Sequence, residues 1–410
     1  MTFEELYRTM LKQAVERGSV QADDLEASAG HLDCLLHPQD HPLVWPLNPC
    51  TCPKEETHCA AACLFDAIVR RDDGTLAVDP DRCSGCGACI QACQSGNLTA
   101  SRDVLPALDA VKHAKGPVYA LIAPAFLGQF STVVTPGRLR SAFKLLGFTG
   151  MVEVALFADL LTLKEALEFD RNIHTETDFQ LTSCCCPMWI GMIRKLYHEL
   201  MPHVPGAVSP MIAAGRTVKK LHPDAVTIFV GPCIAKKAEA READLAGAVD
   251  YVLTFQEMQD IFQAADIHPE LLEESERDHS SRAGRIYART GGVSEAVRTT
   301  VARLHPERPI QVRTRQADGV PACRAMIEDI RSGQHQANFF EGMGCTGGCV
   351  GGPKVLLDRE TGRENVDRYG DEAEFSTPLD TPYVLKLLRL LGFDTVEEFL
   401  EQSDIFIRHF

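Results

Sequence analysis

The sequence has no uninterrupted apolar stretch long enough to cross a bilayer. Near its first residues it has neither an apolar export-signal core nor a twin-arginine pair. We therefore expect a cytoplasmic protein with no membrane contact of its own, unless it associates with a membrane-bound partner. Positive charge is also scarce, since 41 lysines and arginines stand against 57 aspartates and glutamates, for a formal net charge of −16. Because the basic residues are scattered, nucleic acid is not an expected partner.

The chain is otherwise ordinary in composition, with 45% hydrophobic and 24% charged residues, as in a soluble globular protein. Its 410 residues suffice for two or three domains with sizeable cores. Apolar runs that are typical of buried strands alternate with helical patterns, which favours α/β layers around a largely parallel sheet. The expected strands lie at 118–126, 225–233 and 251–255. The expected helices lie at 135–148, 159–170, 211–222, 294–305 and 321–333.

Cysteine is abundant, with sixteen in the chain. Disulfides are disfavoured in a reducing compartment, so clustered cysteines there more often bind metal or do chemistry. The run Cys83-x-x-Cys86-x-x-Cys89-x-x-x-Cys93 has the spacing of a ferredoxin loop, in which the fourth cysteine ligates a second cluster. The partner set is Cys50-x-Cys52 followed by Cys59-x-x-x-Cys63.

These eight cysteines predict two [4Fe–4S] clusters. We assign one cluster to Cys50, Cys52, Cys59 and Cys93. We assign the other cluster to Cys63, Cys83, Cys86 and Cys89. Zinc is the less favoured alternative, because four-cysteine zinc sites occur as two separated pairs. The gap between Cys50 and Cys52 is tighter than usual, which makes that assignment the weaker of the two.

Four further cysteines follow in three segments: Cys186 in "TSCCCPMW" (182–189), Cys233 in "GPCIAKKAE" (231–239), and Cys345 and Cys349 in "EGMGCTGGCVGG" (341–352). Each lies at a strand end or in a loop, where the open edge of an α/β sheet builds its sites. Glycines let the backbone approach a bulky inorganic core closely. Together these cysteines can hold a third cubane.

These three segments, in this order and downstream of a ferredoxin-like module, resemble the signature segments of the [FeFe]-hydrogenase family. The stretch "IAPAF" (122–126) resembles a fourth segment of that family. The resemblance implies an α/β protein in which an N-terminal two-cluster ferredoxin-like domain precedes a two-lobed α/β hydrogenase catalytic domain with the active site between its lobes. The expected segments are a helical 1–45, a ferredoxin-like 46–105, a catalytic 106–375 and a helical tail at 376–410.

The resemblance also implies the cofactor, an H-cluster. In the family this is a cubane joined through one cysteine to a two-iron unit that carries CO, cyanide and an azadithiolate. By position the cubane ligands are Cys186, Cys233, Cys345 and Cys349, with Cys349 as the bridge. Lys236 would donate to a cyanide, Met343 would pack near the two-iron unit, and Ala123 and Pro124 would lie under the other cyanide. The plain alternative, a solvated surface lysine, applies more to Lys237 than to Lys236.

A proton relay is implied beside Cys186. Counting back from Pro187 gives Cys185, whereas counting forward from "TS" gives Cys184, because this sequence has one extra cysteine. We favour Cys185. Glu165 and Glu168 resemble the family's glutamate pair, although an ordinary exposed acidic helix face explains their spacing equally well.

The implied activity is that of a hydrogenase, which interconverts H₂ and oxidised ferredoxin with protons and reduced ferredoxin. Four positions depart from the well-studied enzymes and resemble the divergent sensory subgroups: Ala125, Pro205, Met211 and Gly231. No PAS-like or kinase segment is visible, so a sensory role would require a separate signalling partner. The expected partners are ferredoxin and the family's maturation enzymes. The alternative is a Narf-like iron–sulfur protein that carries cubanes only, which would need neither Lys236 nor a cysteine beside Cys186.

Overall fold

The computed structural model describes residues 1–410 except 23–24, 54–56, 73–74, 184 and 276–278. The chain begins with α1 (Phe3–Arg17), where Thr2 and Glu5 form a capping box. The apolar face of α1 packs against α5 (Val104–His113) and α11 (Phe255–Ala264) and enters the largest hydrophobic core. A second helix, α2 (Ala29–Leu36), packs against both α1 and α5.

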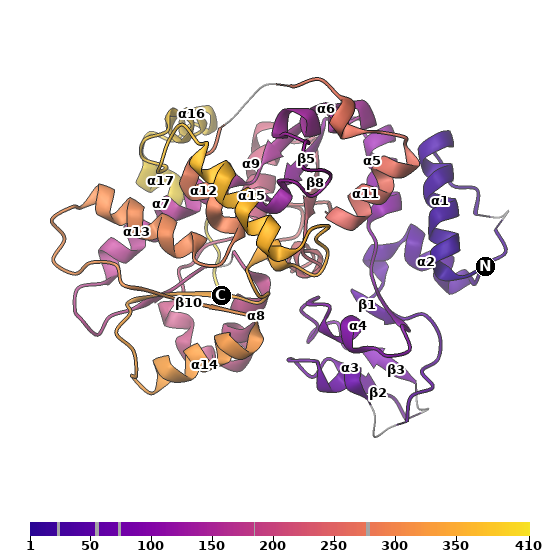
Figure 1. The fold of residues 1–410 in the computed structure, drawn as a ribbon, viewed down its shortest axis with the longest axis horizontal. Coiled ribbons are helices and arrows are strands. Elements are labelled where there is room, and N and C mark those ends of the chain that lie inside the picture. Colours follow the sequence, from indigo (N-terminus) through magenta and orange to yellow (C-terminus); the bar gives the residue numbers. More distant parts are fainter. Residues whose placement is uncertain (23–24, 54–56, 73–74, 184, 276–278) are drawn as a thin grey trace.

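The cysteine-rich part forms a small unit at the lower right of Figure 1. Two antiparallel pairs build it: β1 (Val44–Pro46) with β4 (Leu98–Ala100), and β2 (Ile68–Arg70) with β3 (Leu76–Val78). Two short helices, α3 (His58–Ala61) and α4 (Ala88–Ala92), contact each other beside these pairs. Their small separate core includes Val44, Leu76 and Leu98 together with cysteines of the predicted clusters.

The remaining strands form two parallel sheets. The first has four strands in the order β6 (Gly150–Glu153), β5 (Val118–Ile122), β8 (Val226–Gly231) and β9 (Tyr251–Thr254). The second has three strands in the order β10 (Thr314–Asp318), β11 (Phe339–Met343) and β7 (Gln180–Leu181). This ferredoxin-like unit followed by parallel α/β layers confirms the predicted fold class.

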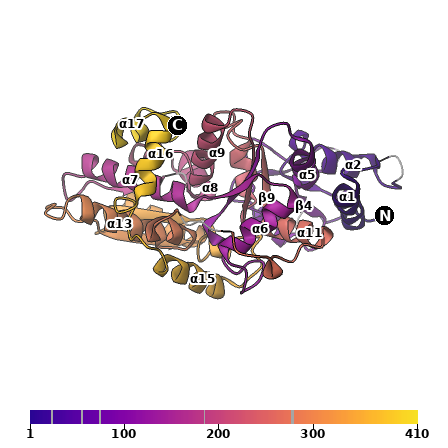
Figure 2. The same ribbon diagram turned by 90° about the horizontal axis from the view of Figure 1, so that it is seen from above.

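Helices cover these sheets and connect their strands. The longer ones are α6 (Pro136–Leu146), α7 (Ala155–Asn172), α8 (Pro187–Leu196), α9 (Pro210–Leu221), α13 (Gly292–Leu304), α14 (Val320–Arg331), α15 (Arg359–Asp371) and α16 (Pro382–Leu391). The short ones are α10 (Ala235–Ala240), α12 (Arg282–Arg285) and α17 (Val396–Glu401). Figure 2 shows α1 and α2 at one end of the molecule and α7 and α13 toward the other. The C-terminal helices α16 and α17 pack on α7.

The expected helices and strands are present, with one correction. The strand predicted over 118–126 ends at Ile122, and Pro124–Phe126 forms a 3₁₀ turn instead. Pro124 has no N–H to give to a neighbouring strand, so the ladder stops before it. Among the described residues, no helix is long and apolar enough to cross a membrane. The division into four segments stays a prediction.

Candidate functional site

The three downstream cysteine segments come together from both sheets. Cys186 follows β7 and precedes α8, Cys233 follows β8, and Cys345 and Cys349 follow β11. They all leave the carboxyl ends of parallel strands, where α/β sheets build their sites. The backbone N–H of Gly344 donates to the Cys186 sulfur over 3.3 Å. A Cβ on Gly344 would lie 2.4 Å from the Cβ of Met188, so this close approach requires glycine.

Three of the four thiols have a raised pKa. Burial raises the pKa of Cys233 to about 11, and the nearby Cys186 adds to the rise. Burial raises the pKa of Cys349 to about 12, with further contributions from Cys186 and Cys233. The pKa of Cys345 is also raised, first by burial and then by Cys233 and Cys186. These three thiols resist ionisation on their own, and binding to iron is what would favour their thiolate forms.

Two of these four cysteines line a cavity. In the described part of the chain, no three His, Cys, Asp or Glu side chains are grouped closely enough to hold a single metal ion. The cavity has a volume of about 1020 Å³, and Cys233 and Cys345 line it together with Cys63 and Cys86 of the ferredoxin-like unit. The arrangement fits multi-iron clusters better than a zinc ion.

The ferredoxin-like unit contacts the site directly. A Cβ on Gly85 would lie 3.1 Å from the Cα of Ala235, and one on Gly87 would lie 3.1 Å from the side chain of Ile234. The loop from Cys83 to Cys89 therefore packs on the segment that carries Cys233. A cluster held by this loop would be the nearer relay for electrons.

The eight upstream cysteines fall into two groups. Cys50, Cys52, Cys59 and Cys93 line one cavity together. In the other group, burial raises the pKa of Cys89 to about 12, and Cys86, Cys83 and Cys63 raise it further. These are the two sets that the spacing predicts. Near the first group, the Arg70 guanidinium donates to the Cys52 carbonyl over 2.8 Å and lies 3.9 Å from the Cys50 sulfur.

Lys236 lies beside the downstream cysteines and is 7% exposed. Burial lowers the pKa of this lysine, but Glu239, Cys233 and Cys349 raise it, and the net shift is upward. The ammonium therefore stays charged between a carboxylate and two thiols. The surface interpretation is wrong for Lys237 as well, because its fully buried ammonium pairs with Glu257 at 2.9 and 3.0 Å.

The remaining predicted contacts of the two-iron unit lie around the same cysteines. Met343 is buried in the hydrophobic cluster against which Cys185 and Cys186 pack. Ala123 is buried in the cluster against which Cys349 packs, and Pro124 follows it in the 3₁₀ turn. A Cβ on Gly231 would lie 2.6 Å from the Phe229 ring and 3.0 Å from the Ala123 Cβ. This tight contact explains why position 231 has no side chain here.

Cys185 has two buried carboxylic acids nearby. Burial raises the pKa of its thiol well above the usual range, and Glu165, Cys186 and Glu341 raise it further. Cys184, the alternative relay, lies outside the described residues. Glu165 in α7 is 1% exposed, so it does not belong to an ordinary solvated acidic face. Glu168 is half-buried and forms an ion pair with Lys164 at 2.5 Å.

Glu341 was not anticipated from the sequence. It lies in β11 with no exposed area and accepts hydrogen bonds from the backbone N–H groups of Gly291 and Ser294, each over 2.7 Å. Little in the sequence points to this residue, because a single glutamate in an otherwise apolar strand belongs to no periodic pattern.

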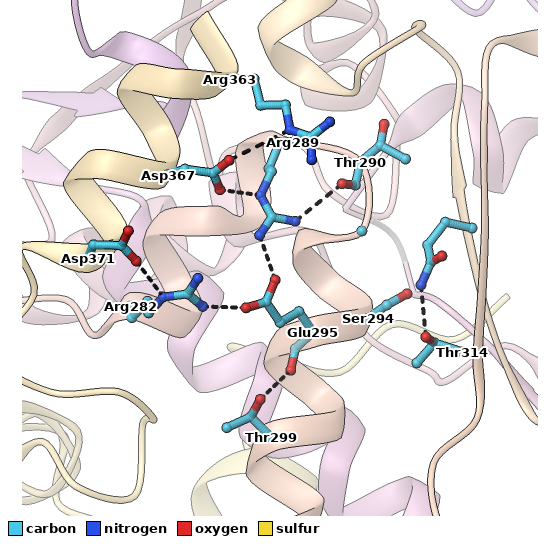
Figure 3. A network of polar contacts seen from close by, with 12 residues as sticks. Arg282, Arg289, Thr290, Ser294, Glu295, Thr299, Thr314, Arg363, Asp367 and Asp371 are labelled. Atoms are coloured by element: carbon cyan, nitrogen blue, oxygen red, sulfur yellow. Dashed lines mark hydrogen bonds and ion pairs between the residues drawn. The ribbon is translucent and has the colours of Figure 1, made fainter. Parts of the chain in front are cut away.

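A polar network of ion pairs fixes α13, the helix that begins at Gly292, to α15 (Figure 3). Arg289 pairs with both Glu295 and Asp367 at 2.5 Å. Arg282 joins the same Glu295 to Asp371. The N-terminus of α13, whose backbone N–H groups donate to Glu341, is thereby anchored to α15.

Comparison with known proteins agrees with this arrangement. The profile described as iron only hydrogenase large subunit, C-terminal domain, matches residues 116–353, more than half of the chain. The chain belongs to the iron-only hydrogenase family. A second profile, the 4Fe-4S binding domain, matches residues 76–99.

Two curated relatives match this chain over longer stretches than the hydrogenase profile does. Iron hydrogenase 1 of Clostridium pasteurianum is 28% identical over 275 residues, covering 57% of this chain and 48% of that protein. NADP-reducing hydrogenase subunit HndD of Solidesulfovibrio fructosivorans is 24% identical over 322 residues, covering 66% of this chain and 55% of that protein. The chain thus spans about half the length of the curated relatives it matches.

Solved structures share the fold. The structure of HydA(deltaEFG), which concerns stepwise [FeFe]-hydrogenase H-cluster assembly, aligns with this chain with a TM-score of 0.63 at 21% identity. The alignment covers 75% of this chain and 98% of that one. A variant of [FeFe]-hydrogenase HydA1 from Chlamydomonas reinhardtii aligns with a TM-score of 0.62, also at 21% identity, with the same coverage of both chains. At this identity the likeness supports the fold of the hydrogenase domain.

Proposed function

We propose that this chain is an [FeFe]-hydrogenase, with its H-cluster bound by Cys186, Cys233, Cys345 and Cys349. When bound, that cofactor supplies the interconversion of H₂ with two protons and two electrons. The observation that carries the proposal is Lys236, a buried ammonium next to Cys233 and Cys349. A cubane alone needs no such donor, whereas a cyanide in a dry site accepts a charge-assisted hydrogen bond from it. This argues against a Narf-like protein with cubanes only.

Residues of the chain itself would transfer protons, exclude water and hold the clusters that carry electrons. We infer that Cys185 exchanges a proton at the site and that Glu165, a buried acid that acts on the same thiol, exchanges it further. Met343 and Ala123 are buried apolar groups that keep water from the site. Electrons would pass through the cluster of Cys63, Cys83, Cys86 and Cys89, and then through the cluster of Cys50, Cys52, Cys59 and Cys93.

The physiological electron partner is also a proposal. A 41-residue stretch is 49% identical to one component of the Na(+)-translocating ferredoxin:NAD(+) oxidoreductase complex of Acetobacterium woodii. That likeness supports a ferredoxin-type carrier. A sensory role would use the same site and would be distinguished by a bound signalling protein.

The test begins with anaerobic reconstitution, which should give about twelve irons per chain from three cubanes. The protein then receives the two-iron unit, from the family's maturation enzymes or as a synthetic precursor. We expect infrared bands from CO and cyanide and hydrogen evolution from a reduced viologen dye. A fully loaded cubane protein without those bands would overturn the proposal in favour of the Narf-like alternative. Lys236→Ala should retain the cubanes but hold the two-iron unit weakly, because a buried cyanide loses its charged donor.

A further inference from the structure

The loop that carries Cys345 and Cys349 has a backbone that does not fix its own shape. Gly347 and Gly348 both have positive φ angles, 86° and 84°, which glycine adopts freely and other residues rarely do. Adjacent glycines lose much conformational freedom when they are ordered. Contacts from outside the loop must therefore hold it in one conformation.

One carboxylate holds the middle of this loop. Asp318 is the last residue of β10 and pairs in register with Met343 of β11. Its Oδ2 accepts hydrogen bonds from the backbone N–H of Gly347 and from the hydroxyl of Thr290, each over 2.9 Å. The backbone N–H of Thr290 donates in turn to the Gly347 carbonyl over 3.1 Å. Asp318, Thr290 and Gly347 thus form a closed ring of three hydrogen bonds.

Thr290 is itself held in place. Arg289 donates to its carbonyl over 3.3 Å and pairs with Glu295 of α13 and Asp367 of α15 (Figure 3). Arg289 also forms an antiparallel bridge with Gly348, where an added Cβ would lie 2.8 Å from the backbone nitrogen of Thr290. The ring therefore ties the cysteine loop to a segment that ion pairs fix to two helices.

Helix capping does not account for Asp318. An aspartate near the start of a helix commonly caps it. The N-cap of α14 is Gly319, however, and it makes no side-chain hydrogen bond there. The observed hydrogen bonds of the Asp318 carboxylate go instead to Thr290 and Gly347, which are 28 and 29 residues away along the chain.

We propose that Asp318 is the positioning residue of the loop that carries Cys345 and Cys349, and that it holds both cysteines in place for the active-site cubane. It acts through the backbone of Gly347 and not on the cysteine sulfurs. The inference rests on the proposed function through the cubane ligands, but it does not require the two-iron unit. Groups that orient metal ligands from outside typically change metal affinity about 10- to 100-fold when they are replaced.

The test uses the full chain, reconstituted anaerobically with iron and sulfide and without the two-iron unit. Asp318→Ala removes the acceptor, whereas Asp318→Asn removes the charge and keeps an oxygen that can accept both hydrogen bonds. The measurements are iron per chain, the rate at which a chelator removes iron, and the electron paramagnetic resonance spectrum of the reduced protein. The spectrum of Cys186→Ala serves as the reference for the two ferredoxin-type clusters alone.

We expect Asp318→Ala to bind the active-site cubane about 10- to 100-fold more weakly and to change its spectrum. The two ferredoxin-type clusters should be retained. Asp318→Asn should restore iron retention and the wild-type spectrum, because its amide oxygen replaces the lost acceptor.

Asp358 provides a matched control. Its carboxylate also accepts a backbone N–H and a threonine hydroxyl, both from Thr361, over 2.9 and 2.7 Å, and it caps α15. Asp358→Ala should lower thermal stability and leave iron content, chelation rate and spectrum unchanged.

Thr290→Val tests the same ring from its other side and serves if Asp318→Ala fails to fold. It removes the hydroxyl and keeps the backbone N–H that donates to Gly347. It should weaken cubane retention in the same direction as Asp318→Ala and add nothing in the double variant.

Three outcomes would overturn the inference. They are wild-type cubane retention and spectrum in Asp318→Ala, equal impairment in Asp318→Asn and Asp318→Ala, and loss of the ferredoxin-type clusters together with the active-site cubane. A wild-type protein that binds only about eight irons would instead overturn the proposed ligand set, so the two failures are distinct.

Discussion

Ser183 donates both its backbone N–H, over 3.0 Å, and its hydroxyl to the same carboxylate oxygen of Glu165. The second oxygen of Glu165 is buried without a hydrogen-bond partner among the described residues. Ser183 lies two residues before Cys185, so this contact ties the triple-cysteine segment to α7. The carboxyl group of Glu165 is therefore held by one oxygen, and its other oxygen is available to exchange a proton.

Glu165→Gln should therefore slow turnover while leaving every cluster in place. The amide keeps the acceptor for Ser183 but cannot release a proton, and acid–base groups contribute about 10²- to 10⁴-fold. Hydrogen evolution by the loaded variant is the measurement, with iron content and infrared bands as controls. Glu168→Gln is the matched variant, because Glu168 is half-buried and already paired with Lys164. Equal rates for Glu165→Gln and wild type would exclude Glu165 from the proton path.

The same glutamate makes stability depend on pH. Burial raises the pKa of Glu165 to about 7, despite the hydrogen bonds from Ser183, against an ordinary value of 4.5. A raised carboxyl pKa means that the folded protein binds the proton more tightly than the unfolded chain. The stabilisation is thus complete below pH 4.5 and is lost as the pH rises through about 7. Wild type should lose free energy of unfolding relative to Glu165→Gln over this range, as measured by denaturant titration at several pH values. Parallel pH profiles would contradict this account.

Local spacing predicted that Cys50, Cys52, Cys59 and Cys93 lie together, because a ferredoxin loop needs only neighbours along the chain, and these four cysteines line one cavity. The strands at 226–231 and 251–254 were equally plain, since they are short apolar runs that are buried on both faces. Contacts between distant residues were not visible. Lys237 pairs with Glu257 twenty residues away, and Glu341 binds the start of α13, so neither partner could be inferred from its own segment. In a sequence, a charged residue that will be buried cannot be distinguished from a surface residue unless its partner is known.

Cys185→Ala should keep the clusters and the infrared bands but lose most turnover, by about 10²- to 10⁴-fold. We favour Cys185 as the relay because Glu165, a buried carboxyl group that can exchange a proton, lies close enough to act on this thiol. Cys184→Ala is the matched variant and should be mild. If Cys184→Ala is the inactive one, our assignment is wrong; if neither variant is slow, protons reach the site by another route.

Cys186→Ala should remove the active-site cubane and leave the two ferredoxin-type clusters. Iron content should fall from about twelve to about eight per chain. Cys323→Ala is the control, since Cys323 is a fully buried thiol that donates to the Met343 and Ala317 carbonyls and belongs to no predicted cluster. That control should lose stability and keep its iron. Twelve irons in Cys186→Ala would remove this residue from the ligand set.

Arg70 should set the reduction potential of the cluster of Cys50, Cys52, Cys59 and Cys93. Its guanidinium lies 3.9 Å from the Cys50 sulfur, and a fixed positive charge favours the more negative, reduced form of a cluster. Arg70→Leu should therefore lower that potential by on the order of tens of millivolts. Arg71→Leu removes the same charge from an exposed side chain one residue along and should change the potential little, because water screens it.

The measurement is a redox titration followed by electron paramagnetic resonance, which resolves the two ferredoxin-type clusters without turnover. The predicted cluster of Cys63, Cys83, Cys86 and Cys89 would be the nearer one to the proposed active site, because Cys63 and Cys86 line the same cavity as Cys233 and Cys345. A higher potential at the predicted cluster near Arg70 would therefore favour electron flow away from the active site. Arg70→Leu should accordingly slow hydrogen oxidation more than hydrogen evolution. An unchanged potential in Arg70→Leu, or an equal shift in Arg71→Leu, would show that the contact with Cys50 does not tune this cluster.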